Sequence, residues 1–384
     1  MPLPLRLPAI AALLVAAPLS TALAQSSASP PTVTVTGYIQ PQYERLQVEE
    51  AARDRAIFRR LYLGVQTTIA KNWSGTILID FAPLLQDDRI GIGDVLLRYN
   101  GVSGKGLTFS LGHQKIPFSR SILMSSRSRS LVERPFTGER AFGAPGRGIG
   151  AQVDGRHADQ RFQWSASLAS VMHAPNAQEL RLSGIADAED TWNEGVMVVG
   201  RAEWHPLGPV AREQGDFERG PFRVMGGLSA YAWTNDGDRN LFTRDGVSSS
   251  PTFADLDAAQ AVEVSGGLRG HGVSVDAAWS RVQGETIDPQ FTGGIYVDGR
   301  ASLHETAVEA GYMVILSRLE ALASLDSLAI DARSATAYRP SFGAVWYVDG
   351  HRLKFSAMHR QSVNVLGVRG ARGRQTYLQA QYGF

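Results

Sequence analysis

The sequence contains no cysteine, and this absence excludes two classes of protein. A small secreted scaffold needs cysteines for its disulfides, and a thiolate metal site needs them as ligands. The eight histidines are scattered through the chain without the spacing of a metal site. We therefore expect no metal and no other cofactor.

Lysine is also scarce. The chain has only Lys71, Lys105, Lys115 and Lys354, and the remaining 34 of its 38 basic residues are arginines. Arginine keeps its charge and binds planar oxyanions through a fork of N–H donors, which lysine cannot do. The formal net charge of +1 indicates no particular class of partner.

Long apolar runs are confined to the first 24 residues. One early charge, Arg6, is followed by an apolar run from Ala9 to Leu19 and by the small-x-small triplet that ends at Ala24. This pattern predicts a secretory signal peptide over 1–24, cleaved near Ala24, with residues 25–384 as one domain. An exported chain has no use for nuclear RNA, so the serine–arginine repeat at 125–130 predicts no nucleic-acid partner.

Alternation of apolar and polar residues runs through nearly the whole remaining chain. Residues 161–168, for example, place Phe162 and Trp164 on one face and Arg161 and Gln163 on the other. Such alternation is typical of half-apolar strands. It predicts sixteen strands, at 33–46, 56–70, 74–81, 92–99, 106–114, 147–155, 160–171, 194–204, 222–233, 260–269, 272–282, 302–313, 316–326, 339–348, 351–360 and 374–384.

The gaps between these strands alternate between long loops and short turns, with residues 205–221 as the exception. A transmembrane antiparallel β-barrel sorts its connections in this way, whereas a soluble secreted β-sandwich has no reason to. The chain also ends on an alternating strand with a terminal aromatic, Phe384, which would be a hazardous free edge in a soluble protein. The sequence therefore predicts an all-β, outer-membrane-type barrel.

The third long loop, 115–146, carries an excess of positive charge. It contains Lys115 and five arginines, among them Arg127, Arg129 and Arg134, against two glutamates. Folded into the barrel, it would narrow the pore and line it with fixed positive charge, which favours anions. Folded outward, its arginines would meet water or lipopolysaccharide phosphates. Composition alone does not decide between the two directions.

The stretch "AIFRRLYLGVQTTIAKNWSGTILID" at 56–80, followed by "GDVLLRY", "LGHQKIPFSR…SSRSRSLVER" and "GRGIGAQV", resembles the phosphate-selective porins O and P. The resemblance implies trimers of sixteen-stranded barrels whose third loop folds inward. It also implies that pore residues of the family correspond to Arg59, Arg60, Asp94, Ser125, Ser126 and Arg134. The chain departs from the pattern at Ile122, where phosphate-selective members carry a lysine, and Arg120 and Arg127 are the candidates to replace it.

Strict alternation constrains one pair of these residues. It places Arg60 in the lumen with Tyr62 and Gln66, and Arg59 on the lipid face with Leu61 and Leu63. Both arginines can face the pore only if the strand contains a β-bulge at this point.

These observations lead to one hypothesis about function. We expect an outer-membrane porin of a Gram-negative bacterium, a homotrimer in contact with lipid and lipopolysaccharide, that catalyses no reaction. Small anions, phosphate and pyrophosphate among them, would diffuse through a constriction formed by Arg127, Arg129 and the residues above. A non-selective porin and a lipase-like barrel enzyme are the alternatives.

Overall fold

The computed structural model describes residues 32–49, 51–87, 89–102, 106–183, 194–235 and 254–384. The predicted signal peptide, 1–24, and its cleavage site near Ala24 lie outside these residues. Residues 31–384 form one compact unit, and the following account concerns that unit.

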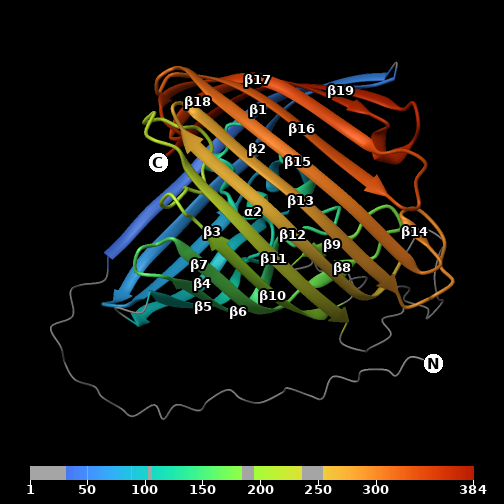
Figure 1. The fold of residues 1–384 in the computed structure, drawn as a ribbon, viewed down its shortest axis with the longest axis horizontal. Coiled ribbons are helices and arrows are strands. Elements are labelled where there is room, and N and C mark those ends of the chain that lie inside the picture. Colours follow the sequence, from blue (N-terminus) through green and yellow to red (C-terminus); the bar gives the residue numbers. More distant parts are fainter. Residues whose placement is uncertain (1–31, 50, 88, 103–105, 184–193, 236–253) are drawn as a thin grey trace, which may run out of the picture. The chain divides into compact units, whose positions relative to one another are not determined.

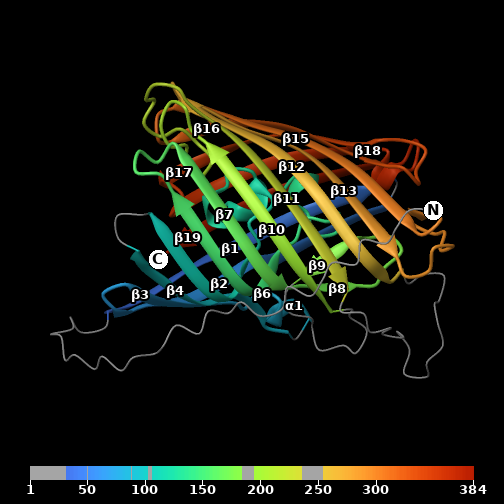
Figure 2. The same ribbon diagram turned by 60° about the horizontal axis from the view of Figure 1, so that its bottom comes forward.

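Sixteen antiparallel strands form a closed barrel (Figures 1 and 2), because the first strand pairs with both the second and the last. This confirms the predicted fold and strand number. The wall consists of β1 (Thr32–Val48), β2 (Ala51–Ala70), β3 (Trp73–Asp80), β4 (Gly91–Val102), β5 (Leu107–Lys115), β6 (Arg147–Arg156), β7 (Phe162–Ser170), β10 (Gly195–Trp204), β11 (Arg223–Asn235), β12 (Leu256–Gly270), β13 (Val273–Thr286), β15 (Arg300–Ile315), β16 (Leu319–Ile330), β17 (Ala337–Asp349), β18 (Leu353–Val363) and β19 (Arg372–Gly383).

The remaining elements are short and lie in the connections. They are α1 (Leu84–Asp87), α2 (Arg120–Leu123), the 3-10 turns η1 (Ser126–Ser128), η2 (Phe136–Gly138) and η3 (Val365–Gly367), and the strands β8 (Met172–Ala174), β9 (Arg181–Ser183) and β14 (Tyr296–Val297). No helix among the residues that the structure describes is long and apolar enough to cross a membrane.

The outward face of the barrel is apolar, as the alternation of the sequence requires. In β10, Met197 and Val199 are buried toward the lumen, while Val196 and Val198 point outward. Large aliphatic side chains stay about half exposed on the outer face of successive strands, which include Leu111, Leu168, Val198, Leu228, Leu325 and Leu378. A belt of this kind is stable when it faces lipid and unfavourable in water.

The two ends of the barrel differ. At one end, here called the turn end, the connections are as short as residues 271–272 between β12 and β13. At the other, the loop end, most connections are longer, although only residues 49–50 separate β1 from β2. The longest connection that is described in full is loop 3, residues 116–146. Exposed aromatics ring the wall near the turn end, including Trp73, Phe162, Trp204, Tyr312, Trp346 and Tyr382. Aromatic girdles mark the border between lipid and water in membrane barrels.

Loop 3 folds into the lumen, which answers the question that composition left open. Its apolar residues Ile116, Phe118, Phe136 and Phe142 are buried in one cluster with side chains of β10 to β17. Polar anchors fix it to the same wall: the Phe136 N–H donates to Asp326 at 3.0 Å, and Arg120 is paired with Asp276 at 2.9 Å. One side of the lumen is thereby filled.

A second segment enters the lumen from the turn end. Residues 205–222, the connection that broke the alternation of long and short gaps, fold back inside and are called the turn-end segment here. The Gln214 side chain accepts the N–H groups of Ser130 and Leu131 at 2.8 and 3.1 Å and donates to Glu309 at 3.2 Å. Phe217 packs edge-on against Tyr347 of the wall. The segment therefore supports loop 3 from below.

Candidate functional site

A cavity of about 970 Å³ lies between loop 3 and the wall formed by the first strands, and is called the upper chamber here. Six of the eight predicted site residues line it: Arg59, Arg60, Asp94, Ser125, Ser126 and Arg134. Its lining holds ten basic residues (Arg55, Arg59, Arg60, Lys115, Arg134, Arg140, Arg147, Arg181, Arg339 and Arg360) and five acidic ones (Glu44, Asp80, Asp94, Glu133 and Glu139). The chamber is thus strongly positive, although the protein as a whole is nearly neutral.

Arg59 reaches the chamber through a β-bulge in β2. Gln40 of β1 is opposite Arg60 and Pro41 is opposite Phe58, so Arg59 is the extra residue between them. Phe58 keeps the outward orientation, and both arginines turn inward. This is the irregularity that the paired arginines require in a strand that otherwise alternates.

The bulged Arg59 forms a two-pronged ion pair with Glu133 of loop 3. Its Nε and Nη2 donate to the two carboxylate oxygens at 2.7 and 2.9 Å. Burial opposes the charge on Glu133, but the Arg59 guanidinium outweighs it and lowers the pKa of Glu133 to about 2. Glu133 therefore stays ionised and neutralises Arg59.

The other acids of the chamber are also satisfied. Asp94 accepts from Arg147 at 2.8 Å, Glu139 pairs with Arg339 at 2.5 Å, and Glu44 pairs with Arg55 at 2.6 Å. Asp80 accepts two backbone N–H groups, from Leu61 and Ala82. Four of the five acids are thus paired with a cation, and Asp80 is held by backbone donors.

Five cations of the chamber lack a carboxylate partner among the residues described. Arg60 donates to Gln40 at 2.8 Å, and Arg360 donates to Ser341 at 3.2 Å. Arg134 donates to the carbonyl of Met124 at 3.0 Å and to the Ser126 hydroxyl at 3.1 Å. The other two are Arg140 and Lys115. These hydrogen bonds to neutral acceptors hold the side chains in place without cancelling their charge.

The serine pair lies beside this positive surface. Ser125 Oγ accepts the N–H of Arg127 at 3.3 Å, as the N-cap of η1, and Ser126 Oγ accepts from Arg134. In both cases the serine oxygen is the acceptor, so each hydroxyl proton can still be donated. The two hydroxyls therefore complement the charges of the chamber with neutral donors.

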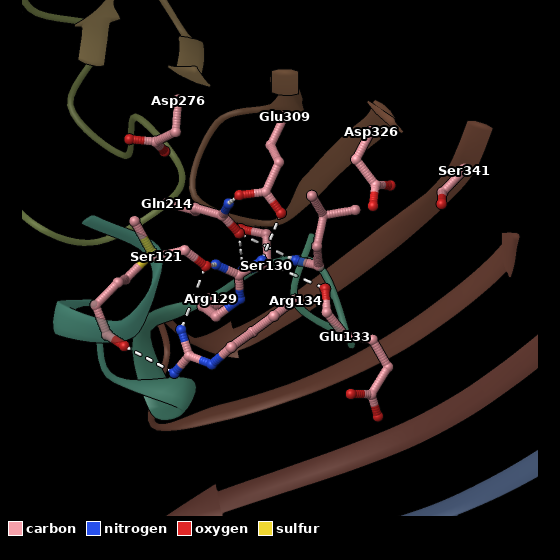
Figure 3. A network of polar contacts seen from close by, with 12 residues as sticks. Ser121, Arg129, Ser130, Glu133, Arg134, Gln214, Asp276, Glu309, Asp326 and Ser341 are labelled. Atoms are coloured by element: carbon pink, nitrogen blue, oxygen red, sulfur yellow. Dashed lines mark hydrogen bonds and ion pairs between the residues drawn. The ribbon is translucent and has the colours of Figure 1, made fainter. Parts of the chain in front are cut away.

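The structure places Arg127 and Arg129 outside the chamber. The Arg129 guanidinium is buried and paired with Glu309 at 2.5 Å, and it also donates to Ser121 (Figure 3). The Arg127 guanidinium packs on Gly383, where an added Cβ would come within 2.8 Å of it. The Arg129 side chain thus fastens loop 3 to β15, and the Arg127 side chain packs against the end of β19.

Neither residue proposed to replace the lysine at position 122 occupies the chamber. Arg120 is buried against Asp276, and Arg127 points to the end of β19. Instead, Lys115 reaches the loop from the end of β5 and donates to the carbonyls of Leu123 and Met124 at 3.0 and 3.4 Å.

Sequence reasoning missed several chamber residues. Lys115 and Arg147 directly flank loop 3 and pair across β5 and β6, so their position at the mouth of the loop was the available signal. Arg140 contributes to the positive charge predicted for the loop 115–146 but was not among the predicted site residues. Arg181 and Arg339 carry no comparable signal, because no local pattern shows that they face the same cavity.

A second cavity, the lower chamber, has a volume of about 450 Å³ and continues toward the turn end. It is lined mostly by residues of β4 to β7, with Leu123 of loop 3 and Arg212 of the turn-end segment. Its charged residues are Arg98, Lys115, Arg156 and Arg212 against Asp94 and Asp154. Together, the two chambers form a positively charged route along one side of the barrel.

Comparison with known proteins agrees with this architecture. Residues 33–206 match the family described as phosphate-selective porin O and P, which confirms the resemblance seen in the sequence. A search of curated proteins found no match to the chain.

Solved structures with the same fold share little sequence with the chain. An anion-selective porin from Comamonas acidovorans superposes with a TM-score of 0.58 at 11% identity, over 92% of this chain and 100% of that one. The outer membrane channel DcaP of Acinetobacter baumannii gives 0.57 at 12% identity, over 92% and 97% of the two chains. OmpT of Vibrio cholerae in its trimer form gives 0.55 at 12% identity, over 93% and 100%. At such low identity these likenesses show the fold alone.

Proposed function

Because residues 33–206 match the phosphate-selective porin O and P family and the chain closes into a sixteen-stranded barrel, we propose that this protein is an outer-membrane porin. Small anions, phosphate among them, diffuse passively through it. The proposal places the protein in the outer membrane of a Gram-negative bacterium, where its apolar belt contacts lipid.

One observation carries the anion preference. Five cations face the upper chamber without a carboxylate partner among the residues described, while every acid in the lining is satisfied. The field of these fixed charges is focused by the low-dielectric barrel wall around a narrow passage. Anions are therefore enriched in the chamber, and cations are depleted from it.

The arrangement favours a pore over a barrel enzyme. A lipase-like site needs a serine within reach of a general base. Within the part of the chain that the structure describes, Ser125 and Ser126 contact Arg134, Arg127 and no histidine. The serines serve as hydrogen-bond donors to the passing solute, and the proposal includes no chemical step.

Assembly as a homotrimer is part of the proposal. Its support is the family match and the fold shared with a porin solved in its trimer form. Lipopolysaccharide phosphates at the loop end are a further proposed contact, available to the exposed arginines Arg45 and Arg53 of the β1–β2 hairpin.

The test is the reversal potential of the purified protein in a planar bilayer under a KCl gradient. We expect the sign of a chloride-preferring channel. Replacing Arg134 with Glu reverses one charge of the lining and should lower the chloride-to-potassium permeability ratio at least about tenfold, since a charge at ~4 Å contributes several kcal/mol at an effective dielectric constant of ~20.

The matched control is Arg318→Glu. Arg318 is exposed at the turn end and donates to the Val348 carbonyl, away from both chambers. The control should leave the permeability ratio nearly unchanged. A wild-type channel without ion preference would indicate a general porin, and equal effects of the two variants would remove Arg134 from the passage.

A further inference from the structure

Lys115 lies where the two chambers meet. Asp94 and Lys115 are the two residues that line both the upper and the lower chamber. Lys115 is the last residue of β5, and loop 3 begins directly after it. A solute that passes from one chamber to the other must therefore pass this part of the wall, which we call the neck.

The two neck residues differ in charge balance. Asp94 is neutralised by Arg147, whose Nε donates to it at 2.8 Å. Lys115 forms no ion pair within the described part of the chain, and its two hydrogen bonds go to the carbonyls of Leu123 and Met124. An ammonium group has three N–H donors, so one remains for a solute.

A second cation converges on the same spot. The Met124 carbonyl oxygen accepts from Lys115 Nζ at 3.4 Å and from Arg134 Nη2 at 3.0 Å. Figure 3 shows the Arg134 guanidinium directed to the loop backbone and away from Glu309 and Asp326. Two like charges around one neutral oxygen repel each other, and an anion between them would relieve that repulsion.

The loop side of the neck presents two apolar side chains beside its backbone carbonyls. Ile122 lines the upper chamber and Leu123 lines the lower one, on either side of the point where Lys115 touches the loop. These two side chains offer an anion no hydrogen-bond donor, so the donors at this point are Lys115 on the wall and Arg134 on the loop.

We infer that Lys115 and Arg134 form an oxyanion-binding site at the neck, and that Lys115 transfers the anion from the upper to the lower chamber. The inference rests on the proposed anion passage. The ligand class is a small tetrahedral oxyanion such as phosphate, whose several oxygens accept from the ammonium, the guanidinium and the Ser126 hydroxyl together.

This assignment also gives the loop position Ile122 a physical meaning. With an apolar residue there, the ammonium comes from the barrel wall. Strand β5 holds Lys115 at the neck, where its side chain lines both chambers.

The experiment measures how phosphate blocks chloride current through single channels in a planar bilayer. Lys115→Gln removes the charge but keeps donors for the two loop carbonyls. We expect the half-blocking phosphate concentration to rise at least about tenfold, the value of one charge-assisted hydrogen bond. Lys71→Gln is the matched control, because Lys71 is exposed in the turn between β2 and β3 and lines neither chamber. It should change the half-blocking phosphate concentration by less than about threefold, because a substitution at a distant site affects binding little.

The absence of native cysteine allows a rescue test. In Lys115→Cys the new thiol is unique, so labelling after assembly changes that position alone. An aminoethyl thiosulfonate reagent, which adds an ammonium, should restore the block, whereas a sulfonatoethyl reagent should abolish it. A merely structural role of Lys115 predicts no difference between the two labels.

The possible results separate this inference from the proposed function. Anion preference in the wild type with unchanged block in Lys115→Gln overturns the inference and leaves the porin intact. Anion preference without any phosphate block does the same. A wild type without anion preference overturns both. If Lys115→Gln and Lys71→Gln weaken the block equally, the neck site is refuted as well.

Discussion

At the scale of single residues, arginines that look alike in the sequence have opposite environments. Arg129 and Arg134 are five positions apart in loop 3. Arg129 is buried against Glu309 and Ser121, so its charge is cancelled and its role is to hold the loop. Arg134 faces the chamber with neutral acceptors only, so its charge remains available to a solute.

This contrast predicts that Arg129→Gln destabilises the barrel. Removing one partner of a buried ion pair leaves the other charge uncompensated, at a cost of about 3–5 kcal/mol. We expect a lower urea midpoint for the loss of the compact, heat-modifiable form. Replacing both partners, Arg129→Met with Glu309→Leu, should recover much of the loss. A single variant as stable as the wild type would show that the pair contributes little.

At the scale of elements, loop 3 depends on the turn-end segment below it. Gln214 of this segment accepts two loop N–H groups and donates to Glu309, the partner of Arg129. His351, in the turn between β17 and β18, donates its Nε2–H to the Gln214 carbonyl at 2.8 Å. The constriction is thus clamped from the wall and from beneath.

We therefore expect Gln214→Ala to loosen the constriction. It leaves the N–H groups of Ser130 and Leu131 without their acceptor, at about 1–3 kcal/mol for each buried donor. Single-channel recordings should show more open-state noise or added substates. Gln290→Ala, at an exposed position in the connection between β13 and β15, is the control and should record like the wild type. Quiet currents in Gln214→Ala would mean that the wall alone fixes loop 3.

The sequence predicted the strands much better than the inserted segments. Each strand repeats a two-residue pattern many times, so its position is specified locally. The turn-end segment has no such repeat, and its anchor joins Gln214 to Ser130, which lies 84 residues away. The distinct surroundings of Arg127, Arg129 and Arg134 depend on acids of β15 and on the end of β19, so no local pattern separates them. The bulge at Arg59 was predictable only because two adjacent arginines were required on one face.

At the scale of the whole molecule, the barrel is inverted relative to a soluble protein, with its apolar side chains outside. Leu325, near the middle of β16, is 52% exposed on this outer face. Only a lipid environment makes that exposure favourable along every strand.

This inversion predicts a strong dependence on depth. Leu325→Arg places a charge near the bilayer midplane, at a cost of about 2–4 kcal/mol, whereas Leu319→Arg lies at the turn end of the same strand, where the cost falls to about 0–1 kcal/mol. Folding into lipid vesicles, followed by urea titration, measures the difference. Equal stability of the two variants would contradict the membrane placement of the belt.

Loop 3 is hydrogen-bonded to the strands at which the barrel closes, and these bonds have a consequence for the order of assembly. The carbonyl of Ser126 accepts from Gln40 of β1, and that of Arg127 accepts from Lys354 of β18 and Gln381 of β19. Strands from opposite ends of the chain supply these donors, and contacts so distant in sequence form late in folding. We therefore expect loop 3 to reach its final position only after the first and last strands have paired.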